Sequence, residues 1–536
     1  MTPNDVKIVA DNIDDFIEVP DGVTRLRKAV LTLAVSGKLV PQDKKEGTAE
    51  ELYKEIQEYQ KKKIEGRKKK ILDSAPLDEE EAPFEIPKTW KWVRFTEIAS
   101  IFNGNSINKN EKEIKYKDVE GIPYIATKDV GFDHVINYES GIGIPKDEWN
   151  NFKLAPKNSV FVCAEGGSAG RKVAHLEREV FFGNKLFAIH PPSILDSKYV
   201  FYYCTSSEFF SAFQSVMAGL IGGVSINKFG DLLLPLPPAG EQVRIVKKVE
   251  EVMKQLDELE NKKQERDEVR IRLACSAMLS LGKGESKIAF EQLIELIKTP
   301  DDIKKLENAL LTLAVSGKLT RQNLSEGTAQ DLFTEIQLKR GEKKKALPPV
   351  TAEEMPFELP KSWMFVRLGD VVSILGDGLH GTPNYSNNGD YYFINGNNLV
   401  SGRIELKSST KRVSVDEYQK HGKTLTDNTV LVSINGTLGN FAFYEHEKVI
   451  LGKSACYFNL LDGVNKLYVG VLIRSPLFLK YAVDVASQTT IKNISLKSMR
   501  LLPLPLPPFL EQKRIVKKVE EVMVLINRLK QVIGEK

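Results

Sequence analysis

The sequence contains little cysteine, and its cysteines do not occur in close pairs. The chain has 536 residues and only four cysteines, and none of these lie in CxxC spacing: Cys163, Cys204, Cys275 and Cys456. Neither a disulfide framework nor a thiolate zinc site is supported, so we expect the chain to work in a reducing compartment. The six histidines include no close pair, and we therefore expect no metal site.

Long hydrophobic runs are also missing. No stretch reaches the roughly 18 apolar residues that a membrane-spanning helix needs, and the N-terminal segment has no apolar core of a signal peptide. An excess of one charge is lacking too, because 76 Lys and Arg face 72 Asp and Glu, for a formal net charge of +4. We expect a soluble, multidomain globular protein whose total charge neither demands nor excludes a nucleic-acid partner.

What the sequence does contain is an internal repeat. The run LTLAVSGKL at 31–39 recurs at 311–319, and PFEIPKTW at 83–90 recurs as PFELPKSW at 356–363. The run RIVKKVEEVM at 244–253 is identical to 514–523, and Leu-Pro-Leu-Pro-Pro precedes both copies. The order of these markers predicts two copies of one structural unit.

Between the markers, the two copies share a framework but differ in their polar residues. Residues 122–130 align with 391–399, and residues 180–183 align with 449–452. Apolar residues and glycines match in these segments, whereas the polar residues do not. Such a pattern is expected of two domains that have one fold and two different binding surfaces.

Short β-branched and aromatic runs, separated by Gly, Asn and Pro, predict two mixed α/β domains at 88–238 and 361–508. Helical regions are predicted before, between and after them, at 1–87, 239–360 and 509–536. In two of the helices, apolar residues follow a 4-3-4-3 spacing, which is typical of a heptad seam. The seam residues are Ile245, Val249, Val252, Leu256 and Leu259, and Ile515, Val519, Val522, Ile526 and Leu529.

We expect the two seams to join the copies to each other. If a pseudo-twofold axis relates the copies, the helices that start near 241 and 511 run antiparallel, and the two α/β domains lie at opposite ends of this coiled coil. The alternative is that each helix is amphipathic and packs on its own domain.

The repeated markers resemble those of the specificity subunit of a type I restriction-modification system. The resemblance implies that the two variable domains are target recognition domains, each reading one half of a split site in double-stranded DNA. It implies that the helices set the unread spacer and hold two modification (methyltransferase) subunits. A helix of about 40 residues spans roughly 60 Å, or at most about 18 base pairs.

The resemblance also places the chemistry in other chains. Methylation with S-adenosylmethionine, and ATP- and Mg-dependent translocation and cleavage by restriction subunits, are implied for the partners. This chain is then expected to bind no cofactor and to catalyse no reaction, in the cytoplasm of a prokaryotic cell.

The residues themselves carry no enzyme signature. Gly452-Lys453-Ser454 resembles the end of a phosphate-binding loop, but the motif requires glycine at position 447, which is Glu447. Leu506 precedes Pro507-Pro508 where an adenine methyltransferase needs an Asn or Asp acceptor. A coiled-coil protein–protein adaptor without DNA readout is the alternative to the DNA-binding subunit.

The candidate DNA-binding residues are polar residues beside the framework segments, because Asn pairs well with adenine, and Arg or Lys with guanine. Asn and Gly are also ordinary turn formers, which is the structural alternative for each position. In the first domain the candidates are Asn105, Ser106, Thr127, Lys128, Asp129, Ser168, Arg171, Lys172, Asn184 and Lys185. In the second domain they are Asp377, His380, Thr382, Asn395, Asn397, Asn398, Asn435, Thr437, Asn440 and Lys453.

Overall fold

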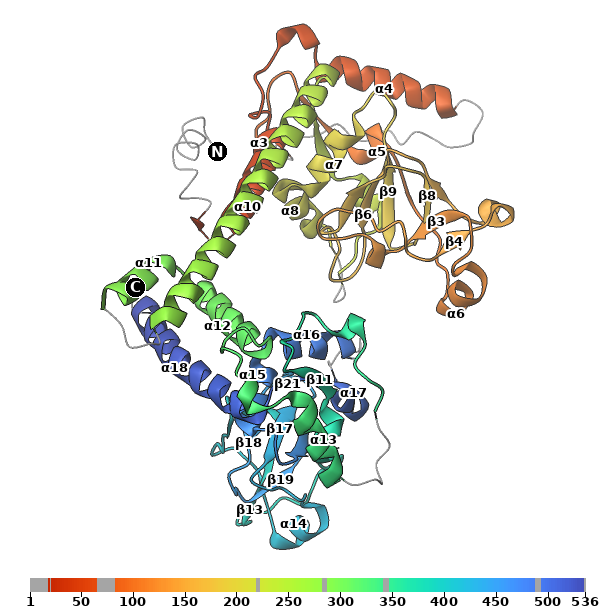
Figure 1. The fold of residues 1–536 in the computed structure, drawn as a ribbon. Helices are drawn as coiled ribbons and strands as arrows, with labels where there is room; N and C mark the ends of the chain where they lie inside the picture. The colour runs from red at the N-terminus through yellow and green to blue at the C-terminus, as the bar shows by residue number, and fades with distance from the viewer. Residues whose placement is uncertain are drawn as a thin grey trace. The chain divides into compact units, whose positions relative to one another are not determined.

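The computed structural model describes residues 18–19, 21–64, 82–217, 222–281, 287–340, 347–486 and 493–534. The chain divides into two compact units, Met1–Gln264 and Glu265–Lys536. In Figure 1 the first unit runs from red to yellow-green and the second from green to blue. Each unit combines an α/β domain with the helices that precede and follow it in the chain.

The first unit contains ten strands and, together with the helix that leaves it, eight α-helices among its described residues. Its strands are β1 (Lys91–Arg94), β2 (Ser100–Asn103), β3 (Ile122–Ile125), β4 (Gly143–Ile144), β5 (Leu154–Ala155), β6 (Val160–Cys163), β7 (Val173–His175), β8 (Val180–Phe182), β9 (Leu186–His190) and β10 (Leu233–Leu236). Its helices are α3 (Gly22–Val35), α4 (Ala49–Ile64), α5 (Phe95–Ile98), α6 (Lys109–Glu111), α7 (Ser197–Thr205), α8 (Ser207–Ser215), α9 (Ile226–Gly230) and α10 (Ala239–Leu281), the last of which ends in the second unit.

The second unit follows the same order. Its strands are β11 (Met364–Arg367), β12 (Val372–Asp377), β13 (Tyr391–Ile394), β14 (Leu399–Val400), β15 (Arg403–Ile404), β16 (Arg412–Val413), β17 (Thr429–Ser433), β18 (Phe441–Phe443), β19 (Val449–Leu451), β20 (Ala455–Leu460) and β21 (Pro503–Leu506). Its further helices are α11 (Lys287–Leu296), α12 (Pro300–Val315), α13 (Ala329–Arg340), α14 (Val415–His421), α15 (Lys466–Arg474), α16 (Pro476–Val485), α17 (Leu496–Leu501) and α18 (Phe509–Gly534).

The sheets of the two units correspond in their central strands, although the second sheet has the order β4-β3-β8-β5 in the first unit and β16-β13-β19 in the second. A four-stranded sheet has the order β2-β9-β6-β7 in the first unit and β12-β20-β17-β18 in the second. A second sheet in each unit contains one parallel pair, β3 with β8 and β13 with β19. An antiparallel pair, β1 with β10 and β11 with β21, joins the start of each α/β domain to its end. The prediction of a mixed α/β fold that occurs twice is confirmed.

The central strands are apolar on both faces because they are covered on both faces. All four residues of β6 and all six of β20 are buried. In the first unit, the two faces of β6 contribute to different apolar clusters, one shared with α7 and α8 and one shared with β3 and β8. Continuous apolar runs are the pattern expected of such doubly covered strands.

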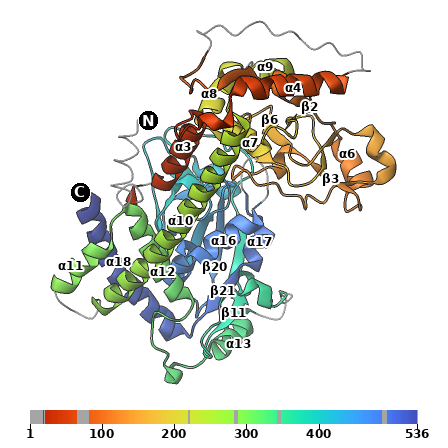
Figure 2. The same ribbon diagram turned by 90° about the horizontal axis from the view of Figure 1, so that it is seen from above.

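The heptad seams pack inside their own units. In the first unit, Leu256 shares an apolar cluster with Val23 and Leu26 of α3, and the two helices lie side by side (Figures 1 and 2). The side chain of Arg27 contacts Glu260 near the middle of α10, whereas Gln42, after α3, contacts Glu241 at its start, so the helices run antiparallel.

The second unit repeats this helix pair. Contacts between α12 and α18 are extensive, with Lys530 bonded to Glu307 and Gln322 bonded to Glu511. Among the described seam residues, Val252 and Leu256 pack against α3, and the seam of α18 lies in a cluster that contains residues of α12 and also Ile271, Ala274 and Met278 of α10. That the seams join the two copies to each other stays a prediction. Ile245 and Val249 pack still further inward, in the core of the first unit, while Leu259 is only half-buried.

The repeated sequence markers meet at one point in each unit. In the first, the carboxylate of Glu241 accepts hydrogen bonds from the Trp90 indole (2.9 Å) and the Gln42 amide (2.5 Å). Arg244 bonds to Glu46 through two nitrogens. Burial raises the pKa of Glu241, so these donors are needed to keep its charge compensated.

The second unit has the same arrangement. Glu511 accepts from the Trp363 indole (2.9 Å) and the Gln322 amide (2.7 Å), and Arg514 contacts Glu326. In both units, the markers therefore connect the first helix, the start of the α/β domain and the exit helix through the same set of contacts.

Candidate nucleic-acid interface

The variable loops of the first unit meet at one edge of its sheets. Strands β3 and β8 are parallel, so both end at the same edge, and the end of β6 pairs with the start of β9 there. Gly183 donates its backbone N–H to Ile125 O, and Ala164 donates to Lys185 O, both at 2.9 Å. The loops after β3, β6 and β8 are thus held against each other, and we call this region the first reading edge.

Most of the first-domain candidates lie on the first reading edge. Lys172 Nζ donates to Thr127 O at 3.1 Å, which joins the loop before β7 to the turn after β3. Lys128, Arg171, Asn184 and Lys185 are exposed. The structure therefore brings together residues that are 45 positions apart in the sequence.

The first reading edge is cationic. The guanidinium of Arg171 lies 5.5 Å from the centre of the Phe210 ring, and Lys185 lies 3.7 Å from Glu165. Burial, and then the neighbouring Lys128 ammonium, lower the pKa of Lys112, which sits over the Tyr124 ring. Sequence reasoning missed Lys112, because it precedes β3 by ten residues and belongs to no framework segment.

Several candidates instead maintain the loops. The side chain of Asn105 accepts from Lys153 N and donates to Asn151 O, which fixes the segment after β2. The Asp129 carboxylate is buried and accepts from Ala126 N at 2.9 Å. Ser168 lies 3.5 Å from the Cys163 sulfur, whereas Ser106 is exposed. We assign Asn105 and Asp129 to loop structure rather than to base readout.

The second unit presents a corresponding edge. Gly452 donates to Ile394 O, and Leu379 donates to Leu451 O, so the segments after β12, β13 and β19 meet as their counterparts do. We call this region the second reading edge. The exposed candidates on this edge are His380, Thr382, Asn397, Thr437 and Lys453.

In the second unit too, some candidate side chains form hydrogen bonds within the protein. Asn398 is buried, accepts from Asn395 N and donates to Glu405 O. Asn395 accepts from the Ser454 hydroxyl, and the backbone of Asn435 pairs with Asn493. The half-buried Asp377 holds His380 through a 2.6 Å contact. Asn398 is therefore structural, and Asn440 is half-buried.

The two edges share a backbone framework but carry different chemistry. The glycines that turn the loops after β6 and β17 both have a left-handed conformation, with φ of +69° at Gly170 and +85° at Gly439. The next residue is Arg171 in the first unit and Asn440 in the second. Cations thus dominate the first edge, and amide and hydroxyl groups dominate the second.

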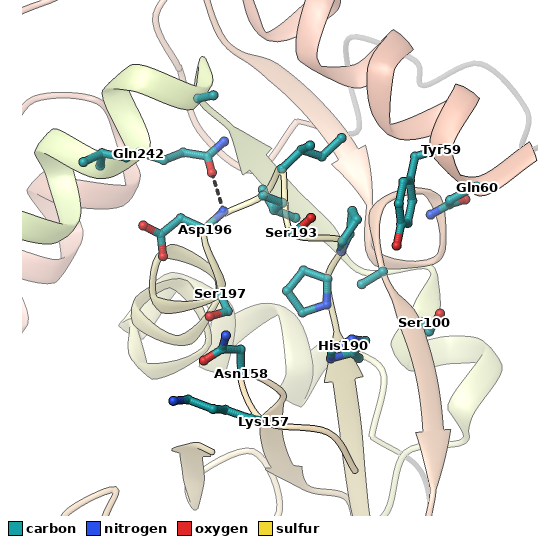
Figure 3. Close-up of a pocket in the computed structure, with 17 residues that line it drawn as sticks. Tyr59, Gln60, Ser100, Lys157, Asn158, His190, Ser193, Asp196, Ser197 and Gln242 are labelled. Atoms are coloured by element: carbon teal, nitrogen blue, oxygen red, sulfur yellow. Dashed lines mark hydrogen bonds between the residues drawn. The ribbon is translucent and has the colours of Figure 1, made fainter. Parts of the chain in front are cut away.

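A polar cleft lies away from the first reading edge. Its volume is about 510 Å³, and Figure 3 shows its lining side chains. The cleft lies where β6 begins and β9 ends, between α4 and the starts of α7 and α10. Gln242 accepts from Asp196 N at 3.0 Å, and its counterpart Gln512 accepts from Asn465 N at 2.8 Å. This cleft therefore contains part of the repeated framework, and none of its residues was among the predicted DNA-binding residues.

A known sequence family matches both halves of the chain. The profile of the type I restriction modification DNA specificity domain matches residues 87–268 and again residues 360–535. The chain belongs to this family. The family expected from the repeated markers is confirmed. The first matched segment contains one α/β domain with the start of α10, and the second contains the other α/β domain with all of α18.

Curated relatives agree with the family. The chain is 26% identical to the EcoAI type I restriction enzyme specificity subunit of Escherichia coli, over 96% of this chain and 91% of that protein. It is 27% identical to the EcoEI specificity subunit of the same species, over 95% and 90%. A solved HsdS subunit from Thermoanaerobacter tengcongensis is 17% identical over 84% of this chain and 94% of that chain, with a TM-score of 0.27.

The described part of this family member contains neither a disulfide nor a group placed to bind a metal. Its four cysteines are buried and unpaired, and within the described ranges no group of three His, Cys, Asp or Glu side chains is placed to bind a metal. Among those same residues, no helix is long and apolar enough to cross a membrane.

Proposed function

We propose that this chain is the DNA-recognition subunit of a type I restriction-modification complex, and that each reading edge reads one half of a split site. The observation that carries the proposal is the pairing of one duplicated framework with two different polar edges. A protein that reads two unlike half-sites needs this combination, because the framework positions both edges in the same way while the loops choose the bases.

The helices supply the proposed spacer. Helix α10 has 43 residues and continues from one unit into the other, so it is the element that connects the two reading edges. The helix pairs of α3 with α10 and α12 with α18 are the surfaces that we propose for two modification subunits, with restriction subunits joining through them. A pseudo-twofold relation between the units, and a cytoplasmic location, belong to the same proposal.

The edge chemistry leads to a directly testable substitution. Replacing both Arg171 and Lys172 with Ala should weaken binding to the half-site of the first unit and leave the preference for the other half-site unchanged. Removing a base contact would cost about 1–3 kcal/mol at one position, whereas removing a phosphate contact would weaken all sequences alike. Binding to duplexes that vary in one half-site at a time measures this.

The matched control is Lys157→Ala, an exposed lysine at the polar cleft rather than at the reading edge. The control should keep wild-type affinity. If the double variant also bound every duplex with wild-type affinity, Arg171 and Lys172 would be turn residues without a role in DNA binding. A wild-type affinity that did not fall with salt would favour the protein–protein adaptor instead.

We also propose that the chain is non-catalytic and needs no cofactor of its own, with S-adenosylmethionine, ATP and Mg acting in the partner subunits. The support is chemical: the Lys453 loop lacks the first glycine of a phosphate loop, and Leu506 cannot accept from an adenine amine. Calorimetry on the purified chain should show no heat of binding for S-adenosylmethionine or for ATP. Micromolar binding of one of them would contradict this division of labour.

A further inference from the structure

A hairpin at the first reading edge exposes two large apolar side chains. It runs from Val130 to Ile136, which pair with each other, and Gly131 donates its N–H to Val135 O at 2.8 Å. The side chains of Phe132 and Val135 are 64% and 63% exposed. Exposing an aromatic ring and a valine on one tight turn leaves apolar area in water without any benefit to the fold.

The hairpin is held in a fixed shape. His134 has a left-handed backbone with φ of +67°, and the Asp133 carboxylate accepts from Val135 N at 3.2 Å. The His134 ring is turned inward, where its Nδ1–H donates to Val173 O at 3.0 Å and its edge contacts Phe201. Because burial lowers the pKa of His134, the ring stays neutral near pH 7 and anchors the turn. The apolar tip is therefore presented in a defined position.

The surroundings of the tip carry positive charge. The hairpin directly follows the turn at 127–129, and Asn137 donates back to Asp129 O. Lys172 Nζ lies 5.0 Å from the centre of the Phe132 ring and also bonds to Thr127 O. An apolar tip inside a cationic edge is suited to bind a polyanion that also has apolar surfaces. DNA is such a ligand, because its phosphates are anionic and its bases offer apolar edges and faces.

The second unit has a hairpin at the same place in its chain with a different tip. Strands β14 and β15 form it, and its turn contains Ser401 and Gly402, both with left-handed φ. Its exposed residues are Val400, which is 41% exposed, Ser401 and Arg403. The framework thus keeps a hairpin at both edges while the tip changes from an aromatic ring to small and basic residues, as expected of an element that selects bases.

We infer that Phe132 and Val135 form an apolar reading element that packs against the bases of the half-site read by the first unit. This inference rests on the proposed function and names specificity-determining residues within it. The ring contacts thymine methyl groups or wedges against a base step, while Lys128 and Lys172 hold the flanking phosphates.

The test compares Phe132→Ala with Lys172→Ala in the full-length chain, using a duplex selected for binding to the wild type. Phe132→Ala should weaken binding to this duplex about tenfold and leave binding to unrelated duplexes unchanged, because an apolar contact specifies bases. It should leave the slope of log affinity against log salt unchanged, since an apolar contact releases no counterions. Lys172→Ala should reduce that slope by about 0.9 for each phosphate that the variant no longer neutralises.

Two further variants make the result specific. Phe132→Trp should retain most of the affinity, and Val400→Ser should leave the half-site of the first unit unaffected. Replacing thymine by uracil in that half-site removes the methyl group and should weaken binding if the ring contacts it. If the ring instead wedges between bases, 2-aminopurine placed at the contacted step should become more fluorescent on binding.

Unchanged affinity of Phe132→Ala for every duplex would overturn the inference while leaving the proposed function intact. So would a Phe132→Ala variant that binds DNA normally but no longer binds modification subunits, because the tip would then be a protein-binding surface. A wild-type chain that selects no sequence at all would instead refute the proposed function.

Discussion

A fragment that ends near residue 285 is expected to select an inverted repeat in place of an asymmetric split site. It keeps the first unit and all of α10 up to Leu281, but it lacks α12 and α18. In the full chain, Ile271, Ala274 and Met278 of α10 share one apolar cluster with residues of α12 and α18. When α12 and α18 are removed, this apolar face of α10 becomes exposed.

A second copy of the fragment offers a replacement for the missing helices. The pair of α3 with the start of α10 repeats the pair of α12 with α18, down to the identical RIVKKVEEVM run. Each α10 should therefore pack on the helix pair of its partner, which gives an isologous twofold dimer. Each copy of the fragment would contribute its first reading edge, and the two copies would read the same half-site in opposite orientations.

Sedimentation and selection from random duplexes measure both parts of this expectation, with modification subunits added to reach tight binding. The control is the full-length chain, which should stay monomeric and select an asymmetric site. A folded fragment that stays monomeric at tens of micromolar, or that selects an asymmetric site, would show that the two repeats are not interchangeable.

Val249→Asp is expected to unfold the first unit. The Val249 side chain is 0% exposed and belongs to the core that α10 shares with β6, α7 and α8. A carboxylate there would have no partner, and burying an uncompensated charge costs about 3–5 kcal/mol, a large share of the stability of a domain. Binding to the half-site of the first unit should disappear with the fold.

Val243→Asp is the matched control, on the same helix but 59% exposed. Thermal unfolding followed by limited proteolysis should show the control unchanged and the Val249 variant cleaved within 21–264, with the second unit resistant. Val519→Asp should reverse the pattern, because Val519 lies in the core of the second unit. If both variants left the units folded and only separated them, the seams would join the copies after all.

The seam shows where sequence reasoning stops. Apolar spacing of 4-3-4-3 predicts which face of a helix is buried, but it does not identify the partner, because α3, α12 and α18 all offer an apolar stripe. The repeat itself was predictable, because runs such as RIVKKVEEVM occur twice in the sequence, and the markers Trp90 and Glu241 prove to be in contact. Their contact, however, required the fold to bring residues 151 positions apart into hydrogen-bonding distance.

The reading edges were predictable as segments and not as side chains. Polar residues beside the framework segments do lie at the edges, yet Asn105 bonds to backbone groups of a neighbouring loop, and Asp129 and Asn398 bond to backbone groups of their own loops. Asn and Asp form such turns as readily as they contact bases, so residue type alone does not separate the two roles. Phe132 was missed because a single exposed aromatic residue has no pattern in the sequence.

The most direct test of split-site recognition by two reading edges is a map of methylated adenines in the genome of cells that make this protein, with and without its gene. The account predicts methylated adenines in a motif of two short fixed blocks separated by an unread spacer of constant length. This motif should vanish when the gene is deleted, and Arg171→Ala with Lys172→Ala should alter one block only. A methylation pattern that is unaffected by deletion of the gene, or a motif with one continuous block, would contradict it.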